Sequence, residues 1–269
     1  MTLSASLAAL DDAVDAAAAL DLETSRARRV LETARQRLGF EGSAYVLALV
    51  GGTGVGKSSL LNALAGTVVS AASARRPTTG APVAWVAGSA REETAELLAW
   101  LDVREVRDHS DSAFADVAIV DLPDVDSTTP EHRARVDALL PRVDAVVWVA
   151  DPEKYRDAVL HDDFLRRWAP RLARQLVVLN KADRIGADAE RIREHLAASL
   201  RAEGIEKVAV AVTSAARDGD TRELREWIVN GVEAKRVIAE RIAAELRDAV
   251  LDLAALAGVL QEATPLITT

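Results

Sequence analysis

A glycine-rich turn between an apolar run and a helix-forming segment constrains this chain more than any other feature. Residues 46–61 read VLALVGGTGVGKSSLL and contain the pattern G-x-x-x-x-G-K-S/T. Its fixed positions are filled by Gly51, Gly56, Lys57 and Ser58. Glycines let successive backbone N–H groups converge on one anion, and the positive end of the following helix points the same way. The sequence therefore predicts a phosphate-binding loop between a buried strand over residues 45–50 and a helix over 58–65.

The side chains of this loop have distinct expected roles. Lys57 would reach the β- and γ-phosphates of a nucleotide, and Ser58 would bind Mg²⁺ through its hydroxyl group. Both contacts neutralise negative charge. The residues of the loop that we expect to contact the nucleotide are Gly52, Thr53, Gly54, Val55, Gly56, Lys57, Ser58 and Ser59.

Apolar strands and helices alternate through the middle of the chain. Strands are expected at residues 82–87, 103–107, 117–120, 143–150, 175–179 and 207–212. Helices are expected at residues 92–101, 131–140, 156–168 and 187–202. Such alternation is typical of an α/β domain whose mostly parallel sheet is covered on both faces. We assign this domain to residues 41–231.

Both ends of the chain are predicted to be helical. One apolar stripe is formed by Leu3, Leu7, Leu10, Val14 and Ala18, and a second by Ile238, Ile242, Leu246, Val250, Leu253, Leu256 and Leu260. An apolar stripe needs a partner, so we expect the arm of residues 1–40 to pack with the helix of residues 232–269 as a small bundle. The alternative is that each segment packs separately on the sheet.

A second motif follows the strand at residues 175–179, at the edge of the sheet where α/β proteins bind ligands. Residues 180–183 read N-K-A-D. The Asp183 carboxylate can accept hydrogen bonds from N1–H and the exocyclic amine of guanine, a donor pair that adenine lacks, which discriminates by about a few kcal/mol. Asn180 would orient the loop, and the Lys181 stem would lie over the base. The motif therefore predicts GTP or GDP as the ligand.

The last strand is followed by residues 213–215, which read T-S-A. A backbone N–H of this loop can bond the guanine carbonyl group, so we add Ser214 and Ala215 to the nucleotide contacts.

Charge and composition exclude several partner classes. The chain has 42 acidic and 33 basic residues and a formal net charge of −9, which disfavours nucleic acid as a partner. It contains no cysteine, and its four histidines lack metal-ligand spacing, so disulfides and structural zinc are excluded. Neither a signal segment nor a run of about 18 apolar residues is present, so we expect a cytoplasmic protein.

With these motifs the chain resembles P-loop GTPases of the translation-factor-like class and is similar to their Era-like and bacterial dynamin-like branches. Five loops appear in family order, at residues 51–58, 78–79, 121–124, 180–183 and 213–215. The resemblance covers residues 45–230 and implies the three-layer GTPase fold and hydrolysis of GTP with Mg²⁺. It assigns Mg²⁺ to Ser58, Thr79 and Asp121, with Thr78 as the alternative to Thr79, and catalysis to Lys57, Thr79 and Thr53.

Two positions depart from the third motif of the family, D-x-x-G. Asp124 stands at the glycine, and Val125 stands where Ras carries its water-positioning glutamine. A carboxylate beside the γ-phosphate would repel it unless the side chain turns away or meets a cation. The sequence leaves both arrangements of Asp124 open.

The leading hypothesis is a GTP-hydrolysing conformational switch. The dynamin-like resemblance implies a homodimer or paired GTPase across the nucleotide faces. Thr53 would then lie near the segment of Arg75 and Arg76. The resemblance also implies association with the inner face of the membrane through segments absent from this chain. A basic pair in a loop is more often only solvated. The alternatives are a low-activity GTP/GDP-binding interaction module and an Era-like ribosome-associated GTPase, which the acidic composition disfavours.

Overall fold

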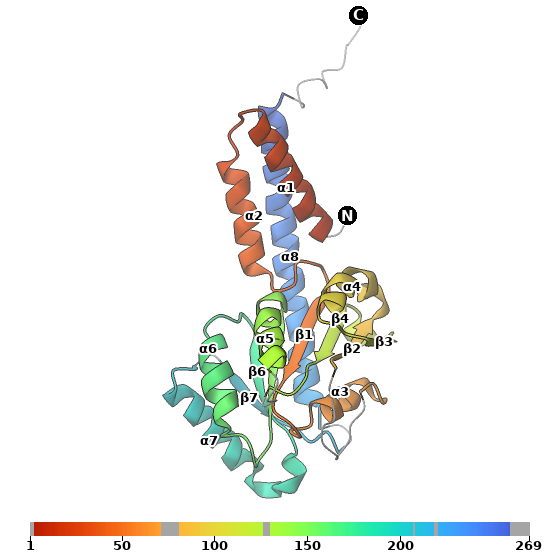
Figure 1. The fold of residues 1–269 in the computed structure, drawn as a ribbon, viewed down its shortest axis with the longest axis vertical. Helices are drawn as coiled ribbons and strands as arrows, with labels where there is room; N and C mark the ends of the chain where they lie inside the picture. The colour runs from red at the N-terminus through yellow and green to blue at the C-terminus, as the bar shows by residue number, and fades with distance from the viewer. Residues whose placement is uncertain (1–2, 71–80, 126–129, 207, 218–219, 259–269) are drawn as a thin grey trace, which may run out of the picture. The chain divides into compact units, whose positions relative to one another are not determined.

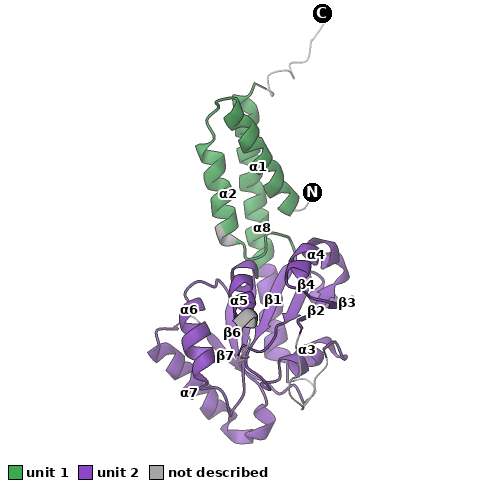
Figure 2. Ribbon diagram, viewed as in Figure 1, with its two compact units in different colours: residues 1–43, 234–269 green, residues 44–233 purple. Residues whose placement is uncertain are grey.

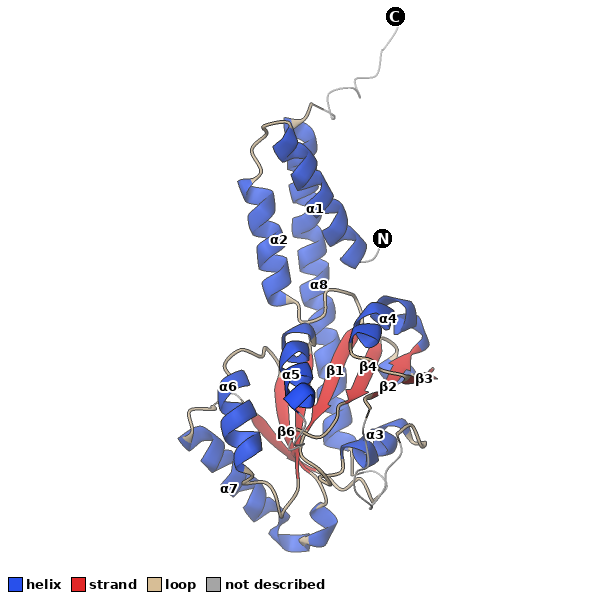
Figure 3. Ribbon diagram, in the orientation of Figure 1, coloured by secondary structure: helices blue, strands red, loops and turns tan. Residues whose placement is uncertain are grey.

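A computed structural model describes residues 3–70, 81–125, 130–206, 208–217 and 220–258. The chain divides into two compact units, residues 44–233 and residues 1–43 with 234–269 (Figure 2). The larger unit is an α/β unit that contains every described strand, and the smaller one is helical (Figure 3).

A seven-stranded sheet forms the centre of the α/β unit, in the order β3-β2-β4-β1-β5-β6-β7. The strands are β1 (Tyr45–Val50), β2 (Val83–Ala87), β3 (Glu105–His109), β4 (Val117–Asp121), β5 (Ala145–Ala150), β6 (Gln175–Leu179) and β7 (Ala209–Val212). Neighbouring strands are parallel except for β2 and β4, which pair antiparallel. The predicted α/β fold with a mostly parallel sheet is confirmed.

Burial of the strands follows their position in the sheet. All six residues of the central strands β1 and β5 are buried, as expected where helices cover both faces. The edge strand β3 carries Glu105, Arg107 and Asp108 and is largely exposed. Charged side chains on an edge strand oppose pairing with another sheet.

Helices connect the strands and cover the sheet (Figure 1). They are α3 (Lys57–Ala65), α4 (Arg91–Trp100), α5 (Pro130–Leu139), α6 (Arg166–Trp168), α7 (Ala189–Ala202) and the start of α8 (Arg222–Leu256). Short 3₁₀ turns occur at Gly88–Ala90, Ser112–Phe114, Leu140–Arg142, Ala182–Arg184 and Gly186–Asp188. One core cluster joins the odd-numbered residues of β1 to α3 and to the first turns of α8, so the strand before the phosphate-binding loop and the helix after it share a core.

The segment before α6 differs from the α-helix expected over residues 156–168. A π-helix occupies Val159–Leu165, and α6 itself is only three residues long. The wider turns accompany the burial of His161, whose Nε2 lies 2.9 Å from the carbonyl oxygen of Tyr155 and whose Nδ1 lies 3.0 Å from Glu203. π-helical turns are uncommon and concentrate near functional sites.

The helical unit consists of α1 (Leu3–Ala19), α2 (Ser25–Arg37) and the part of α8 beyond residue 233. Its core contains Leu3, Leu7, Leu10, Val14, Ala17, Ala27, Leu31, Ala34, Leu38, Ile242, Leu246, Ala249 and Leu253. The terminal segments therefore form a helical bundle, and the bundle has a core of its own. No described helix is long and apolar enough to cross a membrane.

The expected apolar stripe of the last helix is only partly correct. Ile238, Val250 and Leu256 are 40%, 39% and 53% exposed, whereas Ala249 is buried in the cluster. From Ile238 to Val250 the predicted stripe placed a residue every four positions, but an α-helix has 3.6 residues per turn, so such a stripe moves off the buried face after a few turns. A step of three, from Leu246 to Ala249, returns to the buried face. The same correction replaces Ala18 by Ala17 in α1.

The bundle core predicts a contrast between two leucines of α8. Leu246 is 1% exposed and Leu251 is 54% exposed. Leu246→Ala should destabilise the bundle by about 2–5 kcal/mol, because it removes buried methyl groups and leaves a cavity. We expect amide hydrogen exchange in α1 and α2 to accelerate by at least about tenfold. Leu251→Ala should leave these rates unchanged, and equal effects of the two substitutions would contradict the assigned core.

Candidate functional site

The candidate site lies at one edge of the sheet, where five parallel strands end. Strands β4, β1, β5, β6 and β7 are adjacent and mutually parallel, so the loops that follow them meet at their carboxyl ends. These loops begin at residues 51, 122, 151, 180 and 213. Ligands of α/β proteins bind at this edge.

Close contacts and backbone conformation explain the two fixed glycines of the phosphate-binding loop. A Cβ atom at Gly51 would lie 2.4 Å from the carbonyl oxygen of Val149 in β5. Gly56 has a φ angle of +96°, and a Cβ atom there would lie 2.4 Å from Nδ2 of Asn180. A side chain at position 51 would collide with the backbone of β5, and one at position 56 would be strained by the positive φ angle and would displace the Asn180 amide, so the loop requires both glycines.

Lys57 is the first residue of α3, and its side chain is 4% exposed. The ammonium group donates hydrogen bonds to the carbonyl oxygens of Gly51 at 2.9 Å and Gly52 at 3.4 Å. It also forms an ion pair with Asp124, with 2.5 Å between Nζ and Oδ1. Of the two arrangements that the sequence left open for Asp124, the structure therefore has the contact with a cation.

Ser58 and Asp121 form a pair of oxygen groups beside the loop. The Ser58 hydroxyl donates to Oδ2 of Asp121 at 2.6 Å, and the Ser70 hydroxyl donates to the same oxygen at 3.1 Å. Oδ1 of Asp121 is buried and has no hydrogen-bond partner among the described residues. Burial raises the pKa of Asp121, although the nearby Lys57 ammonium group favours the ionised form.

These oxygens fit a divalent cation that prefers oxygen ligands. Mg²⁺ takes one or two protein oxygens and completes its shell with water and phosphate oxygens. The described residues contain no cluster of three or more His, Cys, Asp or Glu side chains that could hold a metal by itself. A cation at this point would therefore depend on the phosphates of a ligand.

Asn180 joins two loops through a buried amide group. Its side chain, which is 1% exposed, donates from Nδ2 to the carbonyl oxygen of Val55 at 3.0 Å. Its Oδ1 accepts a hydrogen bond from the backbone N–H of Ala215 at 3.1 Å. The phosphate-binding loop and the loop after β7 are thus held together by one residue of the loop after β6.

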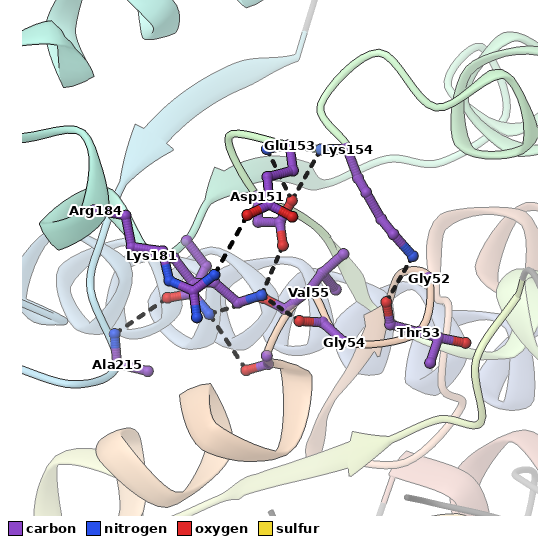
Figure 4. A network of polar contacts seen from close by, with 12 residues as sticks. Gly52, Thr53, Gly54, Val55, Asp151, Glu153, Lys154, Lys181, Arg184 and Ala215 are labelled. Atoms are coloured by element: carbon purple, nitrogen blue, oxygen red, sulfur yellow. Dashed lines mark hydrogen bonds and ion pairs between the residues drawn. The ribbon is translucent and has the colours of Figure 1, made fainter. Parts of the chain in front are cut away.

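Lys181 follows in a left-handed backbone conformation, with a φ angle of +60°. Its ammonium group donates to the carbonyl oxygen of Gly54 and pairs with Asp151, with 2.7 Å between Nζ and Oδ2. Figure 4 shows this lysine between the phosphate-binding loop and Asp151. The stem of Lys181 consequently crosses the space between the two loops.

Asp183 is partly exposed at the mouth of the site. The buried hydroxyl of Ser214 donates to Oδ1 of Asp183 at 2.5 Å, and this hydrogen bond lowers the pKa of Asp183. The carboxylate is therefore ionised at neutral pH and can accept hydrogen bonds from a ligand.

Two residues of the network were not assigned from the sequence. Asp151 is 3% exposed and accepts N–H groups from Glu153 and Lys154, which turns the loop after β5. The Lys154 ammonium group donates to the carbonyl oxygen of Thr53 at 2.8 Å (Figure 4). The available signal was the position of Asp151 directly after an apolar strand, at the same edge as the other loops.

Other predicted site residues fall into two groups. Ser59 lies in the first turn of α3 behind Ser58, and Val125 is 1% exposed, with its N–H donating to the carbonyl oxygen of Gly51 at 3.3 Å. Thr79, Arg75 and Arg76 lie outside the described residues.

Comparison with known proteins identifies a matching family and solved structures with a similar fold. A family model described as 50S ribosome-binding GTPase matches residues 46–181. No curated protein gives a significant match.

Solved structures with a similar fold include members of a bacterial dynamin pair. A structure of an oligomerised bacterial dynamin pair, described as sensing and tethering membranes over a long range, has a TM-score of 0.58 and 18% identity over 95% of this chain and 48% of that chain. A second structure from the same pair has a TM-score of 0.51 and 19% identity over 96% of this chain and 56% of that chain.

A variant of Era from Aquifex aeolicus bound to GDP and AlF4⁻ has a TM-score of 0.50 and 24% identity over 69% of this chain and 56% of that chain. Identities this low show the fold alone. The chain spans about half the length of the structures it matches, between 48% and 56%.

The buried amide of Asn180 predicts a stability effect. Asn180→Ala should lower the free energy of unfolding by about 2 kcal/mol or more, because it leaves the Val55 carbonyl and the Ala215 N–H unpaired in the interior. All five tryptophans lie between residues 85 and 227, so tryptophan fluorescence during urea unfolding reports on the α/β unit.

Asp188→Asn is the matched control, since Asp188 is 61% exposed on the surface and the variant should stay within about 0.5 kcal/mol of the unmodified protein. An Asn180→Ala protein as stable as the control would show that the amide does not hold the loops.

Proposed function

Because the chain belongs to the family of 50S ribosome-binding GTPases, we propose that it binds guanine nucleotides and hydrolyses GTP as a nucleotide-dependent conformational switch. The observation that carries this proposal is the hydrogen-bonded link, through Asn180, between a phosphate-binding loop and a loop that can read a base. The net charge of −9 gives no support for an RNA partner, so ribosome binding is not carried over to this chain.

Guanine selectivity is assigned to Asp183. Its ionised carboxylate offers two acceptor oxygens to N1–H and the exocyclic amine of guanine. Adenine has an acceptor where guanine has N1–H, and it would leave the carboxylate without a donor. The backbone N–H of Ala215 donates to Oδ1 of Asn180, which holds the loop assigned to the guanine carbonyl in place. Lys181 supplies an apolar stem for one face of the base.

Phosphate binding is assigned to the loop between β1 and α3. Its backbone N–H groups and the positive end of α3 attract anions, and Lys57 supplies a full charge. Ser58 and Asp121 would hold Mg²⁺, which supplies charge neutralisation of the β- and γ-phosphates. Thr79 keeps its assignment as a further Mg²⁺ ligand on the resemblance alone.

The site of this chain lacks the glutamine side chain that usually positions the attacking water. Val125 occupies the glutamine position, and its side chain is buried. We therefore infer that a second molecule, paired across the nucleotide faces, completes the site next to Thr53. The fold similarity to an oligomerised bacterial dynamin pair supports this arrangement. Membrane association through segments outside this chain belongs to the same hypothesis.

The readout of the switch is assigned to α8. This helix starts at Arg222, shortly after the loop of Ser214 and Ala215, and it continues into the core of the helical bundle. A change at the base-reading loop therefore acts on a helix that both units share. A low-activity binding module is the alternative function, and Val125 and Asp124 favour it because both replace residues that the family uses in hydrolysis.

Substitution of Asp183, tested against several nucleotides, checks the assigned base contact. Asp183→Asn should weaken GTP and GDP binding by about a hundredfold or more, because an amide has only one acceptor for two guanine donors. The same variant should gain affinity for xanthosine triphosphate, whose N1–H and 2-carbonyl match the amide. Binding is measured by calorimetry with GTP, ATP and xanthosine triphosphate.

Asp188→Asn provides the control, since Asp188 is 61% exposed and pairs with Arg191 on the surface. Equal affinities of the unmodified protein for ATP and GTP would disprove guanine selectivity.

Pairing of two molecules predicts that GTP turnover depends on protein concentration. Activity per molecule should rise over a hundredfold range of concentration, and sedimentation should detect a dimer with GDP and AlF4⁻ but not with GDP. Lys57→Ala controls for contaminating activity, because it removes the phosphate-binding ammonium group and should abolish turnover. Constant specific activity together with a monomer in both states would rule out dimer-driven hydrolysis.

A further inference from the structure

The ammonium group of Lys57 is fully engaged within the protein. An ammonium group has three N–H donors, and here three acceptors surround it, the carbonyl oxygens of Gly51 and Gly52 and the carboxylate of Asp124. The side chains of Lys57 and Asp124 are 4% and 15% exposed, so water screens their attraction only weakly. The charge that should meet phosphate is already compensated by a carboxylate.

Contacts on both sides of Asp124 hold its backbone beside the phosphate-binding loop. Three residues earlier, Asp121 accepts the hydroxyl hydrogen bonds of Ser58 and Ser70. On the other side, Val125 donates its N–H to Gly51 and buries its side chain. Residues 121–125 are therefore attached to the phosphate-binding loop at both ends, which keeps the backbone of Asp124 within reach of Lys57.

We propose that Asp124 is an internal anion that competes with the γ-phosphate for Lys57 and makes the site favour GDP over GTP. This inference rests on the proposed function, in which Lys57 binds the β- and γ-phosphates. GDP leaves the place of the γ-phosphate empty, whereas GTP brings further negative charge toward the Asp124 carboxylate. Two like charges that compete for one ammonium group in a poorly screened site change affinity by about tenfold to a hundredfold.

Three substitutions separate charge from shape at this position. Asp124→Asn removes the charge and keeps the shape, Asp124→Gly introduces the residue of the D-x-x-G motif, and Asp124→Glu keeps the charge. Glu105→Gln on the edge strand β3 is the matched control. It makes the same change in net charge as Asp124→Asn, but on an exposed side chain outside the phosphate-binding loop.

The test compares the dissociation constants of GDP and a non-hydrolysable GTP analogue with Mg²⁺ for all five proteins. Asp124→Asn and Asp124→Gly should bind the GTP analogue about tenfold or more tightly than the unmodified protein, with a smaller change for GDP. Asp124→Glu and Glu105→Gln should retain the original ratio of the two affinities. Melting temperatures without nucleotide show whether each variant is folded.

The outcomes distinguish this inference from the function on which it rests. If none of the five folded proteins binds either nucleotide, the proposed function is wrong and the inference fails with it. If the unmodified protein binds GDP but Asp124→Asn weakens the GTP analogue, Asp124 assists Mg²⁺-GTP binding and only the inference is wrong. Equal changes for the two nucleotides would also overturn it, since they would indicate a structural role.

Discussion

The amide group of Asn180 is the contact on which the rest of the site depends. The loops after β1, β6 and β7 come from strands that lie side by side, but strand order alone fixes only their starting points. The amide joins them by donating to the phosphate-binding loop and accepting from Ala215. Because the group is buried, a loop that moved away would leave polar atoms unpaired at a cost of about 1–3 kcal/mol each. The distance between the phosphate-binding loop and the loop after β7 is set in this way.

Charge compensation is a second property of the site. Lys57 pairs with Asp124 and Lys181 pairs with Asp151, so each lysine of the two nucleotide-binding motifs already has a carboxylate partner. The two pairs differ in what a ligand would do to them. Lys181 contacts Asp151 on the base side, where a guanine brings no charge. Lys57 contacts Asp124 where phosphates would arrive, so only this pair opposes an anionic ligand.

The sequence predicted the fold and the loops because their physical signals are local. Apolar strands, the fixed glycines and the N-K-A-D motif each carry a pattern within a few residues, and the sheet order places them at one edge. Asp151 and Lys154 were missed because the loop after β5 has no recognised pattern, and their partners are remote in sequence. Lys154 bonds Thr53 in the phosphate-binding loop, and Asp151 pairs with Lys181 in the loop after β6. The direction of Asp124 could not be predicted, since its contact with Lys57 joins the loop after β4 to the phosphate-binding loop, which is remote in sequence.

Val125 stands at the position of the missing glutamine, and its burial adds to the free energy that the proposed switch would have to supply. Its buried side chain contributes roughly 1.5–3 kcal/mol to holding residues 121–125 against the phosphate-binding loop. A ligand shifts a conformational equilibrium only by its difference in affinity for the two states. In this chain that difference would have to exceed both the burial of Val125 and the ion pair of Asp124 with Lys57. The γ-phosphate is the part of GTP that GDP lacks, so its contacts, including the one with Lys57, have to supply the difference.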